Sequence, residues 1–277
     1  MTSLWEFMVE KNCIDCDTDL TGLTGTLPTE LGLLTNMYKF SITLNKLTGT
    51  LPTEFGLVPM WKFYSGRNRL SGPMPTEIGL WSDLSIFSLW SSQNITGTIP
   101  TEIGLLTNAI VFDLQNTQVS GTIPTEVGLM ASMEELFWAE MKLTGTLPTE
   151  LGLWTNMWIM NLYNNALTGT LPSEIGLLTG MEELYLYSNL LSGSISQEVA
   201  DLPILLIFNA ANNDLTGEIP AYDMVVSGNF TDPDVGAWMS VYSRAINLTG
   251  NALTGTIPSS MCVIDNEDYS LLHCDCS

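Results

Sequence analysis

The most reactive side chains of the chain are gathered near its two ends. Cys13 and Cys16 are separated by two residues, a spacing shared by redox-active and zinc-binding pairs. The remaining thiols and the only histidine follow near the C-terminus: Cys262, His273, Cys274 and Cys276. Metal ligation would use these residue types, but disulfides that staple the two ends are the interpretation we favour. Five cysteines leave at least one without a partner in this chain.

The long middle of the chain offers no catalytic apparatus. Its sequence contains no glycine-rich phosphate loop, dinucleotide-binding turn, kinase signature or Gly-x-Ser-x-Gly elbow. Because His273 stands outside this part, a serine or cysteine nucleophile there would have no histidine as its base. We therefore predict that the protein is not an enzyme, and that it binds no cofactor and no metal ion.

Composition excludes several classes of partner. Of 277 residues, 8 are Lys or Arg and 30 are Asp or Glu, which gives a formal net charge of -22. So acidic a surface repels phosphate backbones and anionic lipid headgroups, so we expect no nucleic-acid partner. The chain has no apolar run long enough to span a membrane, and residues 1–13 show no signal peptide. With 45% hydrophobic residues, the chain can still form a sizeable core.

A repeated phrase determines the architecture that must position any site. Leu-Thr-Gly-Thr-Leu-Pro begins at Leu23 and returns, with small changes, every 23 to 25 residues and once after 38. The repeats start at Leu23, Leu47, Leu70, Ile95, Val119, Leu143, Leu167, Leu191, Leu215 and Leu253. A period in this range predicts a solenoid whose stacked coils bury a common core. One strand spacing per coil gives an array roughly 45 to 50 Å long.

Each coil contains two extended pieces and a helical turn. Phe40 and Ile42 alternate with polar neighbours, which is typical of a strand with one buried face. The Leu-Thr-Gly-Thr piece is the second strand; Thr29 is expected to cap the turn after it, with Glu30 and its counterparts beside the positive end. An asparagine with backbone-bonding capacity recurs at one position: Asn45, Asn68, Asn165, Asn189, Asn213 and Asn251. Met141 replaces it in a middle coil, where we expect a looser stack or a water bridge.

These motifs resemble the plant-type leucine-rich repeat of 24 residues, as in plant and algal extracellular repeat proteins and receptor-like ectodomains. The resemblance covers nearly the whole chain: residues 1–22 form a reduced N-terminal cap, 23–258 the repeats in about ten coils, and 259–277 a cysteine-containing cap cut short. It implies a right-handed α/β solenoid with a concave parallel sheet, a short second sheet, and 3-10 or helical turns on the convex side. The shortened caps suggest a piece of a longer protein.

The same resemblance implies recognition of a ligand. We expect a non-enzymatic, monomeric module, extracellular or on the cell surface, that binds a protein, a peptide or a glycan. Three glycosylation sequons, at Asn94, Asn229 and Asn247, fit this location. Residues 221–236 lengthen one coil, and they either bind a ligand or are a tolerated surface insertion.

The predicted ligand site lies on the outward positions of the concave strands, where aromatic residues gather. Its residues are Tyr64, Arg67, Trp90, Glu135, Phe137, Tyr163, Glu183, Tyr185 and Tyr187. Four of them, Phe137, Tyr163, Tyr185 and Tyr187, are predicted to form one continuous apolar stripe at its centre. Cross-strand stacking that merely stabilises the sheet is the competing interpretation. Basic residues early and acidic residues later on this face favour an extended ligand with opposite charges at its two ends.

The Thr-x-Thr pairs of the second strand support a different function. Pairs such as Thr144 and Thr146 form two rows on one flank, interrupted at Pro73 and Glu218. Regular threonine rows occur on ice-binding solenoids, so a structural or ice-interacting surface protein is the alternative. The repeated glutamates could hold divalent cations, but we favour stabilisation of the turns.

Overall fold

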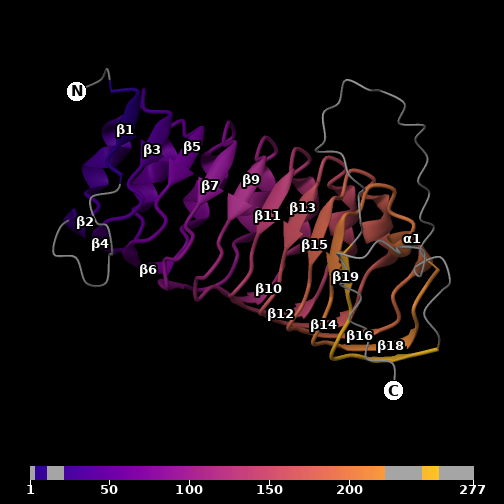
Figure 1. Ribbon diagram of the computed structural model, residues 1–277. Helices are drawn as coiled ribbons and strands as arrows, with labels where there is room; N and C mark the ends of the chain where they lie inside the picture. The colour runs from indigo at the N-terminus through magenta and orange to yellow at the C-terminus, as the bar shows by residue number, and fades with distance from the viewer. Residues whose placement is uncertain (1–3, 11–21, 222–244, 256–277) are drawn as a thin grey trace, which may run out of the picture.

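The computed structural model describes residues 4–10, 22–221 and 245–255. The five cysteines, His273 and most of the insertion at 221–236 lie outside these residues, so the predictions about them remain predictions. The described chain is an elongated stack of coils, as the repeat predicts (Figure 1).

One parallel sheet runs the length of the stack, and its outward side is called the concave face below. Its strands are, in order, β1 (Glu6–Met8), β3 (Lys39–Ser41), β5 (Lys62–Tyr64), β7 (Ile86–Ser88), β9 (Val111–Asp113), β11 (Glu135–Phe137), β13 (Ile159–Asn161), β15 (Glu183–Tyr185), β17 (Ile207–Asn209) and β19 (Ala245–Asn247). Equivalent residues of successive coils are direct neighbours here, as in the pairing of Glu135 with Ile159. Residues 4–10 supply the first strand, which the repeat pattern did not predict.

The Leu-Thr-Gly-Thr pieces form the second layer, in two sheets. The first contains β2 (Thr24–Thr26), β4 (Lys46–Gly49), β6 (Arg69–Pro73) and β8 (Asn94–Thr96). The second contains β10 (Ser120–Thr122), β12 (Lys142–Thr146), β14 (Ala166–Thr170), β16 (Leu190–Gly193), β18 (Asp214–Glu218) and β20 (Ala252–Thr254). An isolated bridge between Thr98 and Ser120 joins them, together with backbone hydrogen bonds from Gln118 N to Ile95 O and from Ser120 N to Gly97 O.

The threonine rows of this layer are staggered. Thr122 pairs with Thr144, and Thr146 pairs with Thr168, so the second threonine of one coil lies beside the first threonine of the next. The two straight rows of equivalent threonines expected from the sequence are therefore offset by two residues at each step.

A short helical turn closes each coil on the side opposite the concave face. The 3-10 turns are η1 (Thr29–Leu33), η2 (Thr53–Leu57), η3 (Thr76–Leu80), η4 (Thr101–Leu105), η5 (Thr125–Leu129), η6 (Thr149–Leu153) and η7 (Ser173–Leu177), followed by the helix α1 (Gln197–Ala200). The predicted capping role of Thr29 is wrong. The N-cap is Pro28, which forms no side-chain cap bond, and the Thr29 hydroxyl donates instead to Glu30 Oε2 at 3.5 Å.

The core between these layers contains an aromatic spine in its N-terminal half. Phe40, Phe63 and Phe87 are fully buried, with ring centroids 5.5 Å apart from one coil to the next. Leu136, Met160 and Leu184 take the same position in later coils. Both stacked rings and packed aliphatic side chains fill the core, which forms only when neighbouring coils cover each other's apolar surface.

The predicted asparagine ladder is confirmed. Asn189 Oδ1 accepts from the backbone nitrogen of Leu167 at 3.1 Å, while its Nδ2 donates to the carbonyls of Leu162 and Leu186 at 3.0 Å each. Ser92, Thr117 and Met141 interrupt this ladder, all three buried. Ser92 and Thr117 flank the gap between β8 and β10, so the lost amides coincide with the break in the second layer.

Candidate functional site

The concave face is built from three outward positions in each coil, because alternate residues of a strand point to opposite sides. The first position precedes the inward spine residue, the second follows it, and the third comes two residues later. The register carries each position from strand to strand; at the third, Glu140 N donates to Tyr163 O and Asn164 N to Tyr187 O. All the predicted site residues lie on this face or at its border, Arg67 exposed and the others half-buried.

Two tyrosines on this face form a closely stacked, nearly parallel pair. The rings of Tyr163 and Tyr187 stack with centroids 4.4 Å apart and an interplanar angle of 7°. Gln115 Nε2 donates to the Tyr163 hydroxyl at 3.0 Å, across the intervening coil whose third position is the small Ala139. Burial raises the pKa of Tyr163 to about 12, with the Tyr187 hydroxyl and Glu140 adding to the rise. Both hydroxyls therefore remain protonated donors at physiological pH.

The continuous apolar stripe predicted from the sequence is interrupted. At the second position Phe137 pairs with Asn161, and Asn161 pairs with Tyr185, so a polar amide separates the two rings. Oδ1 of Asn161 is buried and has no hydrogen-bond partner. A buried acceptor without a partner carries a desolvation cost, and a donor from a ligand would offset it.

Carboxylates border the tyrosines. The Tyr185 hydroxyl donates to Glu183 Oε2 at 3.1 Å, and burial is the main cause that raises the pKa of Tyr185 to about 12. Burial also raises the pKa of Glu135, and the adjacent Glu134 carboxylate adds to this rise. These groups give the C-terminal half of the concave face a negative potential, as predicted.

The early part of the predicted site is a separate cluster. Trp90 lies over Gly66, where a Cβ would overlap the indole ring, and the Arg67 guanidinium lies 5.2 Å from the Trp90 ring centroid. Tyr64 is two residues before Gly66 and pairs with Ser88. A guanidinium over an indole face forms a cation–π contact, which fixes both side chains at the border of the face.

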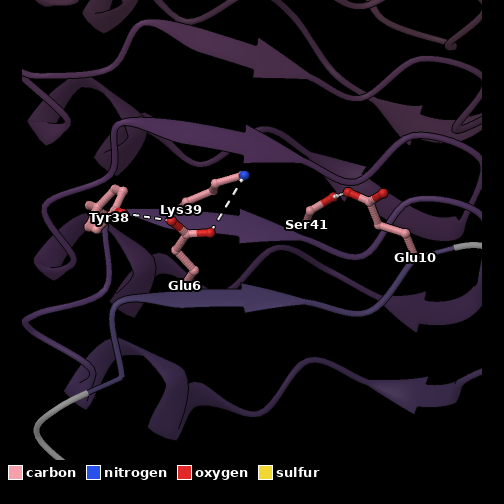
Figure 2. A network of polar contacts seen from close by, with 5 residues as sticks. All are labelled: Glu6, Glu10, Tyr38, Lys39 and Ser41. Carbon is pink, nitrogen blue, oxygen red and sulfur yellow. Dashed lines mark hydrogen bonds and ion pairs between the residues drawn. The ribbon is translucent and has the colours of Figure 1, made fainter.

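The N-terminal edge of the face has its own polar network, shown in Figure 2. Glu6 Oε1 accepts from the Tyr38 hydroxyl at 2.6 Å, and Glu6 Oε2 lies 3.6 Å from Lys39 Nζ. The hydrogen bond from Tyr38 is the main cause that lowers the pKa of Glu6. Ser41 donates to Glu10. These contacts attach β1 to β3 and neutralise Lys39, so part of the early basic character expected from the sequence is compensated.

Between the two clusters lies the half-buried carboxyl group of Asp113. Asp113 Oδ2 accepts from Ser88 Oγ at 3.0 Å, and Oδ1 accepts from the backbone nitrogen of Gln115 at 3.0 Å. Burial raises the pKa of Asp113 to about 6, although both hydrogen bonds oppose this rise. Asn209 and Asn247 make the same bond to the backbone nitrogen two residues later. Asp113 thus performs a structural role with a titratable group.

Sequence reasoning left several residues out of the site. Gln115, Asp113 and Asn161 occupy outward positions, but they are polar, whereas the predicted site is defined mainly by aromatic side chains. Trp61 was missed because it precedes its strand; its side chain is 42% exposed, and Lys62 Nζ lies 4.1 Å from its ring centroid. Strand alternation could not have found it, because alternation places Trp61 on the same side as the inward Phe63.

Within residues 4–10, 22–221 and 245–255, no three His, Cys, Asp or Glu side chains are grouped closely enough to hold a metal ion. The same residues contain no helix of the length and hydrophobicity that crossing a bilayer requires.

Comparison by sequence gives no match to a family model or to a curated protein. Comparison of structures gives clear similarities. The leucine-rich repeat ectodomain of the plant membrane receptor kinase GASSHO1/SCHENGEN3 from Arabidopsis thaliana, solved with CASPARIAN STRIP INTEGRITY FACTOR 2, is 34% identical over 87% of this chain and 27% of its own, with a TM-score of 0.77.

Two further structures widen the comparison. The plant peptide hormone receptor RGFR1, in complex with RGF2, is 29% identical over 88% of this chain and 41% of its own, with a TM-score of 0.68. A leucine-rich repeat protein of Leptospira interrogans is 27% identical over 87% of this chain and 61% of its own, with a TM-score of 0.59. The chain thus spans less than two thirds of the length of each. It has the leucine-rich repeat solenoid fold, of the plant type found in receptor ectodomains.

Proposed function

We propose that the protein is a non-enzymatic recognition module that binds an extended peptide on its concave face, as a receptor-like or secreted extracellular protein. The stacked pair Tyr163 and Tyr187, locked by Gln115, is the observation that supports this most directly. Rigid aromatic side chains supply large contact area at a low entropic cost, which is why they dominate binding energetics. One of the similar structures is a plant peptide hormone receptor in complex with RGF2, and another is a receptor ectodomain in complex with an integrity factor, which supports the same class of ligand.

Charge defines the orientation of the ligand. Glu135 and Glu183 border the tyrosines, so Lys or Arg of the ligand would lie there. Lys62 and Arg67 lie toward the other end of the face and favour an acidic residue. Charged pairs of this kind set register and association rate more than affinity. An extended chain with a basic residue near the tyrosines and an acidic residue toward β5 matches both ends.

The test uses peptides selected by display against the immobilised full chain. For those that bind, we expect Tyr163→Ala with Tyr187→Ala to cost about 2 kcal/mol or more, roughly a thirtyfold loss of affinity. Thr146→Ser, on the other sheet, is the matched control, and circular dichroism confirms the fold of each variant. Peptides whose affinity is the same for the control and the tyrosine variant would move the site away from this face.

A second experiment tests the role of charge by replacing the two glutamates beside the tyrosines with lysine. Glu135→Lys with Glu183→Lys should weaken selected peptides that carry Lys or Arg by roughly tenfold at low salt, with a smaller effect at high salt. Peptides without basic residues should bind both proteins alike. Selection of acidic peptides by the unchanged protein at the tyrosines would contradict the proposed orientation.

The alternative function, ice interaction through the threonine surface, has one supporting observation. The Thr122 methyl packs toward Gly145 of the next coil, 2.8 Å from where a Cβ would stand, and this contact repeats along the sheet. The methyl groups are thereby ordered in one direction. Ice shaping by the protein that Thr144→Tyr with Thr146→Tyr abolishes would favour this alternative, and peptide binding at the tyrosines is independent of it.

A further inference from the structure

A row of leucines faces solvent on the turn side of the stack. The last residue of each turn η1 to η7 is a leucine with 56–71% of its surface exposed: Leu33, Leu57, Leu80, Leu105, Leu129, Leu153 and Leu177. Single exposed leucines are ordinary, but one at the same position of seven successive coils forms a continuous apolar patch. In each turn a glycine and this exposed leucine are followed by a second apolar residue on the core side of the coil, so the two apolar residues are easily assigned to the core together.

Two of the leucines, Leu80 and Leu153, lie against the preceding turn. A Cβ on Gly56 would lie 3.2 Å from Leu80 Cδ1, and a Cβ on Gly128 would lie 3.1 Å from Leu153 Cδ1. The six steps between seven leucines, at about 4.8 Å each, give a row about 29 Å long. The row ends where α1 replaces the turn, since Asp201 follows α1 at the leucine position.

A row of carboxylates runs beside the leucines. A 3-10 turn has three residues per turn, so Glu77 and Leu80 lie on the same side of η3. The space above Gly56 is bordered by both, with Glu77 Cβ 2.7 Å from the position of a Cβ there. Six glutamates of η1 to η7 accept from the hydroxyl that precedes them, as Glu77 Oε2 does from Thr76 at 3.4 Å. We call the leucines and glutamates of η1 to η7 the turn strip.

The basic residues of the described chain lie away from the turn strip. Lys39, Lys46, Lys62, Arg67, Arg69 and Lys142 all belong to strands of the two layers or to the loops directly after them. The turn strip therefore combines an apolar row with an uncompensated negative row. A partner that matches it carries apolar side chains in one line and Lys or Arg in the neighbouring line.

We propose that the turn strip is a docking surface for a cationic amphipathic helix of about 20 residues, which at 1.5 Å per residue is as long as the leucine row. A second copy of the chain fits less well, because each copy has a net charge of -22 and would bring its own glutamate row to the contact. A cationic helix instead gains from both rows, with its apolar side on the leucines and its basic side on the carboxylates.

The probe is a synthetic 20-residue peptide of leucine and lysine with leucines at helical spacing, titrated into the full chain by calorimetry. We expect binding that weakens as salt rises, and at least roughly tenfold weaker binding of a scrambled peptide of the same composition. Leu105→Asn, Leu129→Asn and Leu153→Asn together should weaken the amphipathic peptide by roughly tenfold or more. Glu102→Gln, Glu126→Gln and Glu150→Gln together should reduce its salt dependence.

Further measurements separate this proposal from the concave site. Tyr163→Ala with Tyr187→Ala should leave the binding of the amphipathic probe unchanged, so failure of either site shows independently of the other. Equal binding of the scrambled peptide would reduce the effect to unselective charge attraction and overturn the proposal. A dimer in sedimentation velocity without peptide, lost in the leucine variant, would identify a second copy as the occupant and overturn the cationic helix.

Discussion

Two stretches of the ten-stranded sheet, β3 to β9 and β11 to β15, fill the core at the inward strand position with different side chains. From β3 to β9 the inward position is phenylalanine and the outward side carries Lys39 and Lys62. From β11 to β15 the inward position is leucine or methionine, and the tyrosines face outward. The same coil geometry accepts both arrangements, so the core requires only apolar volume at the inward position. An aromatic ring inside stabilises the stack, whereas a ring outside is available to a ligand.

The largest effect should come from removing one ring of the spine. Phe63 contacts the rings of Phe40, Phe55, Trp81 and Phe87, with centroids 5.3 to 6.1 Å away. Phe63→Ala should lower the free energy of unfolding by about 4 kcal/mol, because a cavity forms between stacked coils. The matched change Met160→Ala, in the aliphatic half, should cost about 3 kcal/mol. Urea unfolding measures both, and a larger cost for Met160 would break the comparison.

A second pair of variants tests the junction between the halves, where the asparagine ladder is interrupted. Asn189→Leu should cost about 3 kcal/mol, since it leaves buried backbone groups of three residues without the amide. Met141→Asn should have the opposite sign and stabilise by about 1 kcal/mol, because it supplies the amide that the neighbouring coils use. Thermal unfolding measures both changes. A destabilised Met141→Asn protein would show that packing of the thioether exceeds the value of the restored ladder.

An effect smaller than that of Asn189→Leu concerns Asp113, at the border of the two halves. Its folded-state pKa of about 6 is raised above the ordinary 3.8, so the folded protein binds this proton more tightly than the unfolded chain does. The resulting stabilisation is complete below about pH 4 and is lost as pH rises through about 6. Asp113→Asn, which imitates Asn209, should therefore raise the free energy of unfolding at pH 7.5 by about 2 kcal/mol.

The pH dependence supplies the control for this variant. The difference in unfolding free energy between the two proteins should shrink as pH falls from about 6.5 to about 3, where Asp113 is protonated in both states. Ser88→Ala should move the upper end of that window to higher pH, because the Ser88 hydrogen bond holds the pKa of Asp113 down. A difference that stays constant with pH would show that the gain comes from packing and not from the carboxyl group.

The sequence predicted the fold in detail because one period decides it. A 24-residue repeat in which Phe40 and Ile42 alternate with polar residues predicts stacked parallel strands. The hydrogen bonds of Asn45 to backbone groups could be predicted because its side-chain amide both donates and accepts. The site was predicted less well. Tyr163 and Tyr187 were found, since strand alternation places them outward, but Asn161 between Phe137 and Tyr185 is only seen once the register is known. The stagger of the threonine sheet depends on how the coils tilt against one another, and no single coil contains that information.

The contact between Gly145 and Thr122 has a consequence for how such a chain can change length. Gly145 has a φ of 75°, and a methyl group added to it would stand 2.8 Å from the Thr122 side chain. A substitution that adds a Cβ at Gly145 is therefore disfavoured, because the two coils are in contact there. Duplication or deletion of an entire coil is compatible with this contact, because the coils that then become neighbours have the same glycine and the same threonine at these positions. The solenoid therefore tolerates the insertion or deletion of a whole coil better than a substitution at Gly145. Its length can change in steps of one strand spacing.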